Sequence, residues 1–100
     1  MHSRTLRERL LETLAAYQAE EARGEYDVAQ SLLAIERVAE LVRSAPLLES
    51  PMAYARLVLA RARDLHAGYD DDSEYGGGRG AMGAAIGRLV QTLRGLGVEA

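Results

Sequence analysis

The stretch APLLESPMAYARLVLARARDL, residues 45–65, decides the fold class of this 100-residue chain. Pro46 disfavours helical geometry in the residue before it, so a preceding helix ends by Ala45. Ser50 followed by Pro51 is typical of a helix start, because serine caps free amide groups and proline suits the first helical position. Apolar side chains then recur at helical period: Tyr54, Val58, Ala62 and Leu65. One helix therefore ends and another begins within this stretch.

The sequence before this stretch contains two further helix starts. Thr5 and Glu8 have the spacing of a capping box, in which each side chain satisfies a free amide of the first turn, and the spacing recurs at Asp27 and Gln30. Gly24 is a natural stop, since glycine readily takes the left-handed conformation found past helix ends. One helix continuous through Gly24 is the alternative, because an internal glycine costs only about 1 kcal/mol. The apolar stripes are Leu6, Leu10, Leu14 and Tyr17, and then Val28, Leu32, Ile35, Ala39 and Val42.

A fourth helix occupies the last quarter of the chain, where the apolar residues at helical period are Met82, Ile86, Leu89 and Leu93. Gly95 and Gly97 close it. No stretch alternates apolar and polar residues as a strand does. We therefore predict a single all-α domain over residues 1–100, a four-helix bundle or array of two helical hairpins. The expected helices are about 5–23, 27–45, 51–67 and 81–95.

Two details of packing are also predicted. Leu47 and Leu48, in the connector between the second and third helices, are expected to cap the end of the core. Small residues lie four apart on the fourth helix, Gly80 with Ala84 and Gly83 with Gly87. Such residues let another helix approach closely, and we expect this approach within the monomer, with a dimer contact as the alternative.

The segment from Gly24 to Ala29, GEYDVA, resembles the turn of a tetratricopeptide hairpin, with glycine, tyrosine and alanine at the same relative spacings. The resemblance covers about six residues. It departs at Glu36, where that family has a small residue, and at Pro46, which comes late. The resemblance implies a helix–turn–helix hairpin, and no family is identified across the chain.

The composition predicts a thin hydrophobic core. Hydrophobic residues make up 48% of the chain, yet Phe and Trp are absent and the aromatic residues are five Tyr. Alanine supplies much of the apolar share, and it favours helices but buries little area. Because such a core gains from a partner, we expect a protein partner, with a homo-oligomer as one form of it.

Charge and chain composition exclude several other classes. A net charge of −3 argues against a general nucleic-acid binder. The absence of cysteine removes disulfides and thiolate chemistry. No apolar run approaches the roughly 20 residues of a membrane span, and the N-terminal MHSRTLRERLLETL has no signal-peptide core. We expect a cytoplasmic protein that does not enter a membrane.

Residues 69–79, YDDDSEYGGGR, are too charged and too rich in glycine for regular structure, and we expect a flexible acidic loop. Tyrosine is a favoured contact residue at protein interfaces, so this loop is a candidate for protein recognition. The candidate contact residues are Tyr69, Asp70, Asp71, Asp72, Glu74, Tyr75 and Arg79.

The sequence contains partial matches to cofactor and metal motifs, but each lacks a residue or element that the motif requires. Residues 78–83 match Gly-x-Gly-x-x-Gly, but no strand precedes them, as a dinucleotide site requires. A calcium loop starting at Asp70 lacks the glycine and the glutamate that an EF-hand needs, having Tyr75 and Ala81 there. His66 has no second histidine or glutamate at ligand spacing. We therefore expect no metal, no cofactor and no enzymatic activity.

Two functions remain open. The first is a non-enzymatic helical module for protein–protein interaction, acting as an adaptor, inhibitor or regulatory subunit. The second is a nucleic-acid-associated helical protein whose basic surface consists of Arg56, Arg63, Arg79 and Arg88, none of which has an acid at helical spacing. Pairing of these arginines with Glu36 and Glu40 of the second helix, or simple solvation, is the competing interpretation.

Overall fold

A computed structural model of the chain describes residues 5–24, 28–68 and 77–98. These residues form four α-helices and no strand. The helices are α1 (Leu6–Glu21), α2 (Val28–Ser44), α3 (Pro51–Gly68) and α4 (Gly77–Gly95). The prediction of an all-α four-helix bundle is confirmed.

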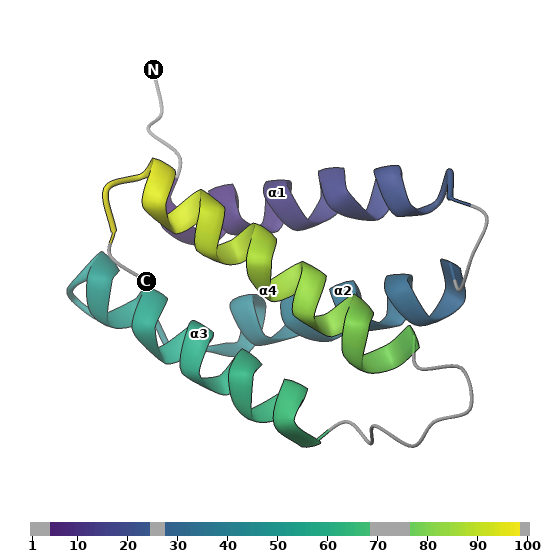
Figure 1. Cartoon of the computed structure of the whole chain (residues 1–100). Coiled ribbons are helices and arrows are strands. Elements are labelled where there is room, and N and C mark those ends of the chain that lie inside the picture. Colours follow the sequence, from purple (N-terminus) through teal and green to yellow (C-terminus); the bar gives the residue numbers. More distant parts are fainter. Residues whose placement is uncertain (1–4, 25–27, 69–76, 99–100) are drawn as a thin grey trace.

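The helices pair as two antiparallel hairpins, α1 with α2 and α3 with α4 (Figure 1). α4 runs diagonally across the molecule and packs against all three other helices. α2 also packs against all three other helices, whereas α1 and α3 scarcely touch one another. The bundle is therefore flattened, with α2 and α4 in contact across its short diagonal and α1 and α3 on the two flanks.

The predicted caps of α1 and α3 are present. The Thr5 hydroxyl oxygen accepts a hydrogen bond from the Glu8 amide at 3.2 Å. At the start of α3, the Ser50 hydroxyl oxygen accepts from the Ala53 amide at 3.4 Å, with Pro51 as the first helical residue. Each cap satisfies an amide that the helix itself leaves without a partner. The proposed cap at Asp27 lies outside the described residues.

The end of α1 differs from the prediction in its mechanism. A helix continuous through Gly24 is wrong, because α1 ends at Glu21. A left-handed stop at Gly24 is also wrong, since Gly97 is the one described glycine with a positive φ. The Arg23 and Gly24 amides instead donate to carbonyls three residues back, Glu20 and Glu21, at 3.1 and 2.9 Å. This tighter turn satisfies the last carbonyls of α1 and ends it.

The helix α4 ends at the predicted glycines, Gly95 and Gly97, and its stop is left-handed. Gly97 has a φ of 82°. Its amide donates to the Arg94 carbonyl at 3.0 Å, and the Val98 amide donates to the Leu93 carbonyl at 2.8 Å. These two bonds define a Schellman motif, and Val98 packs against the core as that motif favours.

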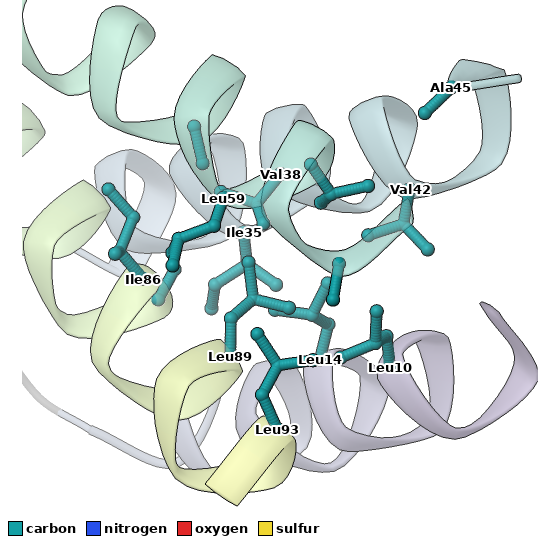
Figure 2. Close-up of a cluster of buried hydrophobic side chains, with 14 of the residues drawn as sticks. Leu10, Leu14, Ile35, Val38, Val42, Ala45, Leu59, Ile86, Leu89 and Leu93 are labelled. Atoms are coloured by element: carbon teal, nitrogen blue, oxygen red, sulfur yellow. The ribbon is translucent and has the colours of Figure 1, made fainter. Parts of the chain in front are cut away.

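The core draws buried side chains from all four helices (Figure 2). All four residues of the predicted stripe on α4 are buried, as are Tyr54, Val58 and Ala62 on α3. Leu47 and Leu48, however, are 65% and 43% exposed, so the prediction that they cap the core is wrong. The buried apolar residues are Leu10, Leu14, Ala34, Ile35, Val38, Val42, Ala45, Tyr54, Ala55, Val58, Leu59, Ala62, Met82, Ala85, Ile86, Leu89 and Leu93.

The core is closed at that end by Arg7 and Tyr54. The Arg7 guanidinium donates to the Ala45 carbonyl at 2.8 Å, just past the end of α2, and lies 5.9 Å from the centre of the Tyr54 ring. The Tyr54 hydroxyl donates to the Val42 carbonyl in the last turn of α2. A cation and a hydroxyl at the carbonyl end of α2 satisfy its terminal acceptors and its dipole. The connector leucines are left outside this closure.

The fourth helix begins at Gly77, four residues before the predicted Ala81. Its glycines do not give the predicted close approach of a neighbouring helix. A Cβ added at Gly80 or at Gly87 would meet nothing within 4 Å. At Gly83 it would lie 3.4 Å from the His66 ring nitrogen Nε2, which is ordinary contact. The expected close approach at Gly80 and Gly87 is therefore wrong, because α4 buries its face of larger apolar side chains, which gain more area.

Two glycine substitutions in α4 and its cap should act in opposite directions. Gly87→Ala should raise the free energy of unfolding by about 0.5–1 kcal/mol, because alanine favours the helix and the site has open space. Gly97→Ala should lower it by about 1 kcal/mol, because the residue has a positive φ. Urea unfolding of both variants checks this, and a destabilising Gly87→Ala would mean that this face is covered.

Candidate interaction surface between α1 and α2

Most of the predicted acidic contact surface lies outside the described residues. Tyr69, Asp70, Asp71, Asp72, Glu74 and Tyr75 fall in the segment between α3 and α4 that the structure does not describe. Arg79 belongs to the first turn of α4. The role of this segment in protein recognition stays a prediction.

The predicted basic residues lie on different flanks of the bundle. Arg56 and Arg63 are exposed on α3. Arg88 lies against α1, where its guanidinium pairs with the Glu20 carboxylate at 3.1 Å and lies over the Tyr17 ring, 4.9 Å from its centre. For Arg88, the expected pairing with Glu36 or Glu40 of α2 is wrong, because its guanidinium pairs with Glu20 of α1 instead. A nucleic-acid role stays a prediction.

A polar seam fastens α1 to α4 at this point. The Thr92 hydroxyl donates to the Thr13 hydroxyl at 3.1 Å, one turn away from the contact of Arg88 with Tyr17. Partial burial, a hydrogen bond with Glu21 and the nearby carboxylates raise the pKa of the Tyr17 hydroxyl above its ordinary 10.0, while the charge of Arg88 lowers it. These contacts therefore favour the protonated form of the Tyr17 hydroxyl, and they hold α1 against α4.

This raised pKa predicts a loss of stability in alkali. Below about pH 9 Tyr17 is protonated in the folded and unfolded states alike, so it adds no pH dependence. As the pH rises through 10, the unfolded chain releases this proton before the folded one, and the free energy of unfolding falls. Urea unfolding at several alkaline pH values should show a shallower fall for Tyr17→Phe than for the parent chain. Equal slopes would contradict the assignment.

On its outer side, the α1–α2 hairpin carries a groove of about 650 Å³. Its α1 wall is uncharged, whereas its α2 wall carries charges of both signs. Leu14 and Ile35, both buried, form its floor. The remaining lining residues are Leu11, Ala15 and Gln18 of α1, and Leu33, Glu36, Arg37, Ala39, Glu40 and Arg43 of α2.

A second hollow of about 250 Å³ lies at the end of α1 where Arg7 crosses to Ala45. Arg7 lines this hollow and lies one helical turn before Leu11 of the larger groove. The two hollows therefore lie along one face of α1, and Arg7 lines the smaller of them. The smaller hollow is lined by Thr5, Leu6, Arg7, Leu47, Leu48, Glu49, Pro51 and Tyr54.

Exposed leucines line both of these hollows. Leu33, at 43% exposure, lines the larger one, and Leu47 and Leu48 line the smaller one. Scattered apolar side chains are normal on a surface, but exposed leucines that line hollows make those hollows candidate binding surfaces. We call these two hollows, together with their lining residues, the α1–α2 face.

Sequence reasoning missed the α1–α2 face as a site. The available signal was Leu33, an apolar residue that falls outside the stripe of α2. Leu11 gave a weaker signal, since it widens the apolar stripe of α1 and both lines the groove and packs against the core. Neither residue shows from sequence alone that the two helices leave a groove between them.

Among residues 5–24, 28–68 and 80–98, no three side chains of the metal-binding types come together to hold an ion. None of the helices in these ranges is long and apolar enough to cross a membrane. Comparisons with protein-family models, with curated proteins and with solved structures find no match for this chain.

Proposed function

We propose that this protein is a non-enzymatic helical module that binds an amphipathic helix of a partner protein on the α1–α2 face. The observation that carries the proposal is that exposed leucines line two hollows beside α1, Leu33 the larger one and Leu47 and Leu48 the smaller one. A helix laid in an apolar groove is a recurring mode of recognition, in which side chains one turn apart supply the anchors.

The two walls of the larger groove suit the two faces of such a helix. The uncharged α1 wall, with Leu11 and Ala15, accepts apolar anchors. Burying a leucine-sized side chain fully contributes about 1.5–3 kcal/mol, so two or three anchors supply most of the binding energy. The charged α2 wall adds selectivity, because its Glu and Arg residues discriminate between partners by the order of their charges.

The Arg43–Glu40 pair on the rim of the groove can exchange partners. The salt bridge between Arg43 and Glu40 joins side chains that are 53% and 68% exposed. A pair this exposed contributes little stability to the fold, since water and salt screen it. Arg43 can therefore turn toward a carboxylate on a bound helix at small cost.

Affinity capture from native lysate with matched variants tests the proposal. Leu33→Asp places a charge on the groove and should abolish capture of whatever protein the parent chain retains. Met52→Asp is the control, because Met52 is 40% exposed, lines neither hollow, and lies in the first turn of α3, where an acid is favourable. Circular dichroism of both variants should show the parent helix content.

The outcome to expect is a protein retained by the parent and by Met52→Asp and lost with Leu33→Asp. Retention of the same protein by the Leu33→Asp variant would contradict the groove as the binding site. A parent chain that retains no protein at all, its own copies included, would contradict the module itself.

A further inference from the structure

We propose that the occupant of the α1–α2 face is a second copy of this chain, with the two α2 helices antiparallel about a two-fold axis at Ala39 and Glu40. This inference rests on the proposed function and names its partner. It is argued from the charges along α2, since Glu36 and Arg43 exchange places when the helix is reversed about that axis.

The charges supply the first step. Glu36 and Arg43 are two helical turns apart, so they share one face of α2, and both line the groove. Each lies about 5 Å along the helix from the Ala39–Glu40 midpoint, on opposite sides of it. In an antiparallel pair centred there, Glu36 of each copy meets Arg43 of the other. The symmetry makes both ion pairs at once, as an isologous interface requires.

Arg43 is already placed for this role. It holds Glu40 of its own helix at 3.2 Å, which neutralises the carboxylate nearest the axis. A guanidinium has five N–H donors, so Arg43 can keep this contact with Glu40 while it meets Glu36 of the second copy. The rim of the groove carries two Glu and two Arg, so its net charge is zero and a second copy meets no net repulsion there.

Leu33 supplies the second step. It lies about 10 Å along the helix before the axis, so Leu33 of one copy falls level with Pro46, just past the end of α2, of the other. Both residues are exposed in the single chain, Leu33 at 43%. At the axis itself stands Ala39, whose small side chain lets two helices approach closely. Apolar contacts thus lie at both ends of the interface and ion pairs between them.

Charge reversal in separate copies tests this register. In Glu36→Arg alone, both ion pairs become Arg–Arg contacts, and in Arg43→Glu alone both become Glu–Glu contacts. Each variant should raise the dimer Kd at least tenfold, an estimate from the cost of like-charge contacts. An equimolar mixture of the two variants restores both pairs and should form a heterodimer. Arg63→Glu, on the exposed surface of α3, is the matched control and should dimerise like the parent.

Sedimentation equilibrium or light scattering at about 100 μM, where a micromolar dimer is mostly formed, measures the association. The proposal is supported by a dimeric parent and control, monomeric single variants and a dimeric mixture. A monomeric parent, single variants that stay dimeric, or a mixture that stays monomeric would overturn it. A monomeric parent that still loses a different captured protein on Leu33→Asp would overturn self-association and leave the proposed function standing.

Discussion

The packing of α2 against α4 across the short diagonal is the contact on which the rest of the bundle depends. Both helices touch all the others, so each flank helix is held by the same central pair. The core they share is small, with alanine at five of its seventeen buried positions and no Phe or Trp. Alanine lets helices approach closely but contributes little buried area, so stability depends on close packing more than on large side chains.

A central α2–α4 pair also leaves one side of the molecule uncovered. α1 is fastened to α4 by the seam of Arg88, Tyr17 and Thr92 and to the end of α2 by Arg7. With its inner face so occupied, the opposite side of the α1–α2 hairpin is covered by neither of the other two helices in the described part of the chain. The leucines and hollows of the α1–α2 face follow from this geometry, and so does its suitability for a partner.

Local signals in the sequence predicted the helices well, because caps and stripes depend on neighbouring residues. Thr5, Ser50 and the α4 stripe behave as predicted. Predictions that depend on tertiary position failed. Leu47 lies outside the core, because Arg7 and Tyr54 already close that end of it. Gly87 faces open space, because α4 buries its larger residues instead. The groove was beyond sequence reasoning, since it is made by the relative placement of two helices.

The central claim is that α2 meets α2 of a second copy at Ala39 and Glu40. The chain has no cysteine, so one introduced thiol reports on one position. A disulfide requires Cα atoms about 4.4–6.8 Å apart, which two copies satisfy only near their symmetry axis. Glu40→Cys should form a disulfide-linked dimer under mild oxidation far faster than Arg61→Cys on α3. Equal rates of cross-linking at the two positions would contradict the account.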